Sequence, residues 1–174
     1  WNDDGSEVTV HVRKGIRWSD GEAFVTVDDW MFWYQDMVQD DRVGAPPPQG
    51  FAAKFVLPEM EKIDDYTVKV SWTSPNPLFL KFLSRSAGGN LSSHRQFTPK
   101  HFLQSYHPEY NSDATNDDIQ ELLTLMNDYQ WNPEYPKFAP WLVVEVTYAC
   151  KMFGYSSYVC KVAPDGKQLP YFDT

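Results

Sequence analysis

Four histidines are the first residues of this chain that could do chemistry, since histidine is a common metal ligand and proton carrier. His101 and His107 are six positions apart, which places them on nearly opposite sides of a helix. His11 falls on the polar face of a predicted strand, and His94 falls in a predicted loop. No two histidines therefore have the spacing of a shared metal, and we expect no metal site and no cofactor.

Pairs of neighbouring aspartates are also frequent, and two carboxylates at a set distance can catalyse hydrolysis when one has a raised pKa. Most of these pairs fall at predicted turns and helix starts, where negative charge favours the backbone amides. The sequence has no nucleophile elbow, no Gly-rich phosphate loop and no zinc-protease motif. We therefore expect capping roles and no enzyme. The pairs are Asp3-Asp4, Asp28-Asp29, Asp40-Asp41, Asp64-Asp65 and Asp117-Asp118.

The two cysteines, Cys150 and Cys160, are candidates for a disulfide. If a strand ending near Cys150 and a strand starting near Ser156 form a hairpin, the two sulfurs come within bonding reach. An oxidising compartment would permit the bond. The alternative is two unpaired thiols that pack as small apolar groups, and the sequence leaves both open.

Composition limits the class of partner. The 174 residues carry a net charge of −9, so nucleic acid and anionic membrane surfaces are not expected partners. No apolar run reaches the roughly 18 residues that a membrane span needs, and the chain shows no signal peptide. With 42% hydrophobic and 16% aromatic residues it can bury a core. The length suits one domain, or one domain and part of another.

The first elements follow from hydrophobic spacing. Val8 to Arg13 alternates apolar and polar residues, which predicts a half-buried strand. Ser19-Asp20-Gly21 predicts a turn. From Val27 the apolar residues recur at helical spacing, and Thr26 with Asp29 three residues later predicts a capping box at the helix start.

The remaining elements alternate between short strands and short helices, with prolines between them. This pattern predicts an α+β fold. Strands are expected at 55–57, 67–72, 141–148 and 156–162, and helices at 78–83, 98–106 and from Thr115 or Asn116 to about 126.

Several segments, taken in order, resemble the extracellular solute-binding proteins of family 5, which are peptide and nickel binders of ABC importers. They cover most of the chain. The segments are Arg13-Lys14-Gly15-Ile16-Arg17-Trp18-Ser19-Asp20-Gly21-Glu22, then 28–34, Lys62 to Val70, Pro99 to Phe102, and Ala163 to Asp173.

The resemblance implies the periplasmic-binding-protein-like II fold. Residues 1–137 would form a segment of the second, small lobe, and residues 138–174 would be strands returning into the first ligand-binding lobe. Relatives are several hundred residues long and the chain begins at Trp1, so we expect an internal fragment. Asp3-Asp4-Gly5 would be a hairpin turn without its first strand, which leaves an unpaired strand edge.

The resemblance also implies a function. The protein would be the substrate-binding receptor of an ABC importer, which captures oligopeptides by closure of two lobes and delivers them to permease subunits. One alternative is an oligosaccharide receptor, which the seven tryptophans suit. The other is a structural or interaction module without a transport role. We expect a monomer that works in the periplasm or outside the cytoplasmic membrane, with any lipid anchor outside this chain.

The ligand site is expected where the family returns into its first lobe. The candidate residues there are Tyr155, Ser156, Ser157 and Tyr158. At this place the family has Arg-Asn-Pro-Tyr-Tyr-Trp, whereas this chain has Phe153 to Tyr158. Because of this difference in sequence, we expect the local backbone geometry and the ligand preference to differ from those of the family.

Overall fold

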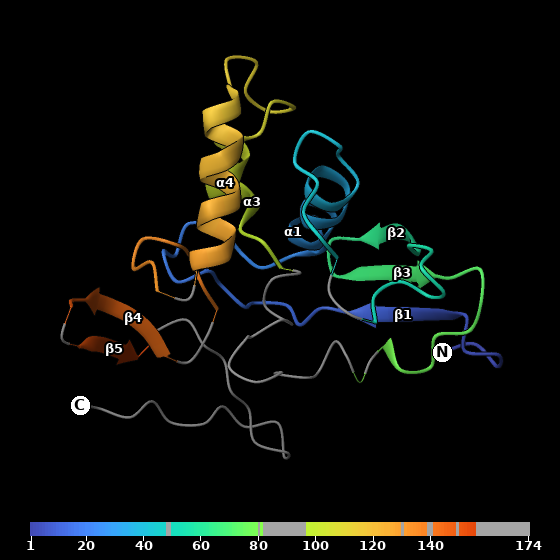
Figure 1. Cartoon of the computed structure of the whole chain (residues 1–174). Coiled ribbons are helices and arrows are strands. Elements are labelled where there is room, and N and C mark those ends of the chain that lie inside the picture. Colours follow the sequence, from blue (N-terminus) through green and yellow to red (C-terminus); the bar gives the residue numbers. More distant parts are fainter. Residues whose placement is uncertain are drawn as a thin grey trace.

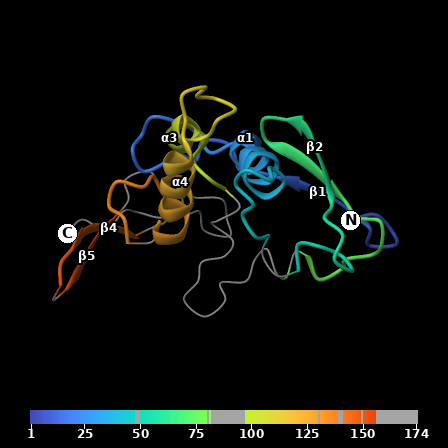
Figure 2. The same ribbon diagram turned by 45° about the horizontal axis from the view of Figure 1, so that its top comes forward.

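A three-stranded sheet, two groups of helices and a β-hairpin follow one another across the molecule (Figure 1). Both views show helix α1 beside the sheet, helices α3 and α4 beyond α1, and the hairpin at the far end (Figure 1, Figure 2). This mixture confirms the α+β class. The computed structural model describes residues 1–47, 50–79, 81, 97–129, 131–138, 141–148 and 150–155.

The sheet is antiparallel, with strand order β1-β3-β2. Its strands are β1 (Glu7–His11), β2 (Glu59–Asp64) and β3 (Thr67–Ser71). Val8 lies opposite Val70, and Val10 lies opposite Val68, so one face of the sheet is apolar and packs on the core. The predicted strands at 8–13 and 67–72 are confirmed. Among the described residues, β1 and β2 are the two edge strands of this sheet.

The second group of helices begins after residue 97. It consists of α3 (Lys100–Leu103), the 3-10 turn η3 (Gln104–Tyr106) and α4 (Asn116–Asp128). Thr115 caps α4: its backbone N–H donates to the Asp118 carboxylate at 2.7 Å, and the Asp118 N–H donates to the Thr115 hydroxyl at 3.4 Å. The predicted helices at 98–106 and from 115 are confirmed.

The first helix is buried over most of its surface, although Gln35 is exposed and Asp28 is partly exposed. Helix α1 (Val27–Met31) continues into a π-helical segment, η1 (Phe32–Val38), whose wider turn is shown by the Gln39 N–H bonding back five residues to the Tyr34 carbonyl at 3.0 Å. All five side chains from Trp30 to Tyr34 are buried. A helix with so wide an apolar face packs against neighbours on most of its sides.

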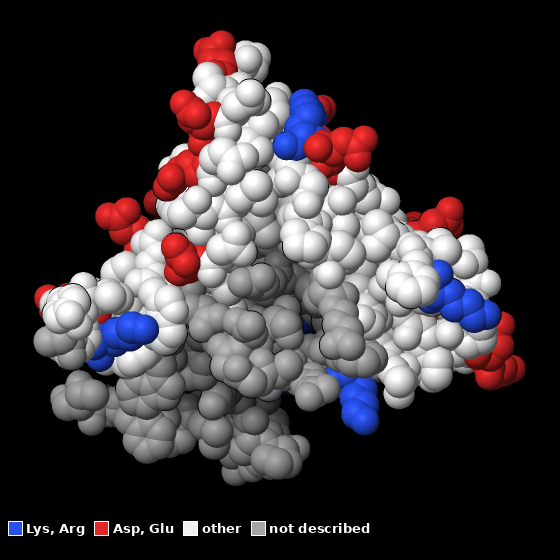
Figure 3. All heavy atoms as spheres, viewed as in Figure 1, with Lys and Arg blue, Asp and Glu red and all other residues white. Residues whose placement is uncertain are grey.

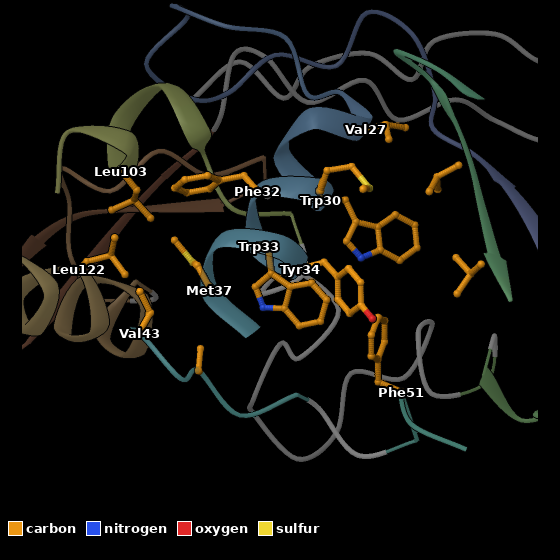
Figure 4. Close-up of a cluster of buried hydrophobic side chains, with 14 of the residues drawn as sticks. Val27, Trp30, Phe32, Trp33, Tyr34, Met37, Val43, Phe51, Leu103 and Leu122 are labelled. Atoms are coloured by element: carbon orange, nitrogen blue, oxygen red, sulfur yellow. The ribbon is translucent and has the colours of Figure 1, made fainter. Parts of the chain in front are cut away.

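The core lies around this helix, between the sheet and α4 (Figure 4). Phe32 and Met37 point toward Leu103 and Leu122 of the second helical group. On another side, the ring of Phe51 packs edge-on against Trp33, with 5.1 Å between centroids. The aromatic residues thus serve mainly as packing, which joins the sheet and both helical groups into one core.

The hairpin differs from its prediction. Strand β4 (Trp141–Val146) pairs with β5 (Lys151–Tyr155), and the turn between them is closed by the Thr147 N–H donating to the Cys150 carbonyl at 2.9 Å. The prediction placed the turn between Cys150 and Ser156, which is wrong. Cys150 is an exposed free thiol at the turn, and Cys160 lies outside the described residues. The Cys150–Cys160 disulfide therefore stays a prediction.

Two further expectations need correction. The predicted strand at 55–57 is wrong: Lys54 and Phe55 have φ of 48° and 69° and form a tight turn bridged by Ala53 and Val56. Strand β2 was not predicted, because nearly all of its side chains are exposed and its sequence is rich in charge. The predicted helix at 78–83 and strand at 156–162 lie largely or wholly outside the described residues.

Figure 3 shows how charged side chains are distributed over one face of the molecule. On the face shown in Figure 3, Lys and Arg side chains lie in small separate groups, and no basic stripe runs across the described atoms. Among the described helices, none has both the length and the apolar character needed to cross a membrane.

Candidate functional site

A tight turn at residues 17–24, here called the signature turn, carries the Trp-Ser-Asp-Gly-Glu motif. The Trp18 N–H donates to the Ala23 carbonyl and the Gly21 N–H donates to the Trp18 carbonyl, both at 3.0 Å. Gly21 has a φ of +75°, which favours glycine. Trp18 itself is only 1% exposed. The turn is therefore a rigid structure anchored by a buried indole.

The buried carboxylate of Asp29 joins the signature turn to both helical groups. One oxygen, Oδ2, accepts the Thr26 N–H at 2.9 Å and the Trp18 Nε1–H at 3.3 Å. The other, Oδ1, accepts the Lys100 N–H at 3.1 Å. Burial raises the pKa of Asp29, and these three donors oppose that rise. These three hydrogen bonds make Asp29 a structural junction between the turn and the helices.

Residues 131–138, here called the exit segment, dock onto the same turn. The Ser19 N–H donates to the Lys137 carbonyl at 2.7 Å, and the Lys137 N–H donates to the Ser19 hydroxyl at 2.9 Å. The ring of Phe138 packs edge-on against Trp18, with 5.3 Å between centroids. These contacts fix the point at which the chain leaves the helical region for the hairpin.

The Lys137 side chain stabilises the exit segment by hydrogen bonds within that segment. This side chain is buried, and its ammonium donates to the backbone carbonyls of Asn132 and Tyr135. Burial lowers the pKa of Lys137 to about 8. A buried lysine bonded to carbonyls holds the loop in shape.

A pocket of about 310 Å³ opens between the signature turn, the exit segment and β4. The volume lies at the lower end of the range for small-ligand sites, about 300–1,000 Å³. Its walls combine polar side chains from the turn and exit segment with apolar ones from β4, and the described part of the pocket holds no nucleophile with an adjacent base. The lining residues are Ser19, Asp20, Pro133, Glu134, Lys137, Leu142, Val143 and Val144.

At the edge of this pocket the fold brings two further polar side chains to Asp20, and the sequence did not reveal the three as a group. Asp20 and Glu22 of the signature turn meet His101 of α3, and their ligand atoms lie within 4.8 Å of one another. The sequence argument compared histidines only with one another. The turn that carries Trp-Ser-Asp-Gly-Glu and the start of α3 lie together because Asp29 hydrogen-bonds to both of them. Recognising that Asp29 joins these two segments is the signal that could have found the group.

Of the predicted ligand-binding residues, only Tyr155 is described. It ends β5, and its backbone lies opposite Trp141 of β4. Ser156, Ser157 and Tyr158 lie outside the described residues, so their role stays a prediction. The pocket found here lies on the other strand of the hairpin and was not foreseen.

Comparison with known proteins gives one family. The model of the bacterial extracellular solute-binding proteins, family 5 Middle, matches residues 1–135. The periplasmic alpha-galactoside-binding protein of Rhizobium meliloti is 31% identical over 99% of the chain, and the dipeptide-binding protein of Escherichia coli is 28% identical over 52%. The chain spans 23% and 19% of these two relatives.

Solved structures agree with this result. An oligopeptide-binding protein OppA is similar over 98% of the chain with a TM-score of 0.70 and 31% identity. The periplasmic binding protein MelB of Agrobacterium fabrum, solved in complex with stachyose, is similar over 98% of the chain with a TM-score of 0.67 and 28% identity. The chain covers 27% and 24% of those two structures.

Proposed function

The chain belongs to the bacterial extracellular solute-binding proteins of family 5, and from this premise we propose that it is part of the substrate-binding receptor of an ABC importer. The supporting observation is that nearly the whole chain superposes on two binding proteins of that kind. Family and fold neighbours are binding proteins and not enzymes.

The division of the chain follows from the same proposal. Residues 1–137 form the segment of the second, small lobe, and residues 138–174 return into the first ligand-binding lobe. The contacts between the exit segment and the signature turn support a boundary near Phe138, because they fix the last residues before the hairpin. Closure of two lobes on the ligand would then stabilise the closed form by contacts from both sides.

Two ligand classes have support. Oligopeptides are supported by the similarity to OppA and to the dipeptide-binding protein. Oligosaccharides are supported by MelB and by the alpha-galactoside-binding relative, whose match extends over nearly the whole chain. The third alternative, a module without a transport role, has no such relative among these matches. The receptor would work as a monomer in the periplasm, next to its permease subunits.

The Tyr155 to Tyr158 stretch is the proposed ligand-contacting part of this chain, because the resemblance to the family places the return into the first ligand-binding lobe there. The two hydroxyl-bearing serines and the two aromatic rings could bind either a peptide backbone or a sugar.

Calorimetry tests this function with a tripeptide and with stachyose as probes, on the full-length protein that carries this chain. We expect saturable binding of one probe and not of the other. The 174-residue chain alone should bind neither tightly, because ligand contacts come from two lobes. Micromolar binding to the chain alone would contradict the two-lobe mechanism.

A further inference from the structure

Asp20, Glu22 and His101 bring three metal-ligating side chains to one place beside the signature turn. One imidazole nitrogen and two carboxylate oxygens lie within 4.8 Å of one another. His101 comes from α3, which is 81 residues from Asp20 in the sequence. Long-range packing therefore creates the cluster.

Two of the three side chains are already oriented. Asp20 Oδ1 accepts the Glu22 backbone N–H at 3.1 Å, which fixes the carboxylate, and Oδ2 lies 2.7 Å from His101 Nε2. The imidazole ring lies against the buried indole of Trp18, with 6.0 Å between centroids. His101 and Asp20 side chains are only 20% and 26% exposed. A ligand held in this way loses little freedom on binding.

The third side chain is available. Within the described part of the chain, the Glu22 carboxylate forms no hydrogen bond or ion pair, although its residue is exposed. The guanidinium of Arg17, in the same turn, donates to the Gly21 carbonyl at 3.0 Å and lies over the Phe24 ring. Glu22 can therefore rotate toward His101 without breaking an existing contact.

We propose that Asp20, Glu22 and His101 form a binding site for a divalent first-row transition cation such as Zn²⁺. One imidazole and two carboxylates suit Zn²⁺, with ligand distances of about 2.0–2.2 Å and a fourth position left for water. Around a tetrahedral ion of that size the ligand atoms lie about 3.3 Å apart, so the Asp20–His101 hydrogen bond opens slightly and the Glu22 oxygen moves inward.

The affinity expected is micromolar, because binding at Nε2 moves the imidazole proton to Nδ1. That nitrogen is buried and has no hydrogen-bond partner within the described residues, whereas strong sites give this proton an acceptor. The bound ion would pin the signature turn to α3, next to the pocket and independently of which ligand the receptor carries.

Calorimetric titration with ZnCl₂ tests the site, on the chain with Cys150→Ser and Cys160→Ser so that thiols do not compete. We expect one Zn²⁺ per chain. His101→Ala and Glu22→Gln should each weaken binding at least about tenfold, while His11→Ala, which changes an exposed histidine outside the cluster, should not.

Glu22→Gln is the decisive variant, because the Glu22 carboxylate has no structural contact to lose and this protein should remain folded by circular dichroism. Unchanged Zn²⁺ affinity in Glu22→Gln, or no saturable binding by the parent chain, would overturn the proposal. Equal weakening by His11→Ala would also overturn it, since binding would then be spread over surface histidines.

Discussion

Replacement of Asp29 by asparagine should destabilise the protein by about 2 kcal/mol. Asparagine has one side-chain acceptor oxygen, whereas the two oxygens of Asp29 accept from Thr26, Trp18 and Lys100. In either orientation the new NH₂ group faces at least one backbone or indole N–H. Each buried donor left without an acceptor costs about 1–3 kcal/mol, and relief of the buried charge offsets a part of this cost.

Urea unfolding followed by circular dichroism measures the change, with Asp28→Asn as the matched control. Asp28 is the neighbouring residue, its side chain is 49% exposed, and its ion pair with Lys62 is at the surface. Exposed pairs contribute about 1 kcal/mol or less. If Asp29→Asn costs no more than Asp28→Asn, the role given to Asp29 as a junction is wrong.

The difference in unfolding free energy between the parent and Asp29→Asn should depend on pH, and the direction of the Asp29 pKa shift gives the sign. Because burial raises the pKa of Asp29, the folded state binds the proton more tightly than the unfolded state. This group therefore favours folding more as the pH falls through its folded pKa. The stability difference between the parent and Asp29→Asn should widen between pH 7 and pH 4, and a narrowing difference would show that the donors outweigh burial.

Two further predictions concern the exit segment and the tight turn. The pKa of Lys137 is lowered from 10.5 to about 8 in the folded protein, so the unfolded state binds more protons in that window. Stability relative to Lys137→Met should therefore rise between those two pH values and stay level below them, and urea unfolding at several pH values would reveal a flat difference if Lys137 were solvated. Replacing Lys54-Phe55 by Asn-Gly should stabilise the chain by about 1 kcal/mol, because both residues have positive φ and the Phe55 side chain is fully exposed. Thermal unfolding checks this, and a loss of stability would show that the Phe55 side chain packs in the folded state.

Local signals predicted much of the fold. The alternation of Val8 to Arg13 and the caps at Thr26 and Thr115 depend on neighbouring residues alone, and the structure confirms them. Strand β2 could not be found in this way, because a strand at the edge of a sheet with exposed side chains has no apolar period. The hairpin turn at Thr147 was missed because its position depends on the register of two strands, which the apolar pattern did not fix.

The site depends on contacts between distant residues. The motif around Trp18 indicated a family. Its structural role depends on Asp29, whose carboxylate accepts hydrogen bonds from the Trp18 indole and from the backbone N–H of Lys100, 71 positions later. The pocket and the Asp20, Glu22 and His101 group likewise need elements far apart in the chain. No local sequence pattern shows which distant residues come into contact. The sequence therefore predicted a candidate site only at the Tyr155 to Tyr158 stretch.

Native mass spectrometry of the full-length protein that carries this chain tests the central claim most directly. A receptor should hold a peptide or an oligosaccharide as a non-covalent adduct and should release it with unchanged mass on unfolding. Binding of neither class, or release of a cleaved product, would contradict the assignment to a solute-binding receptor.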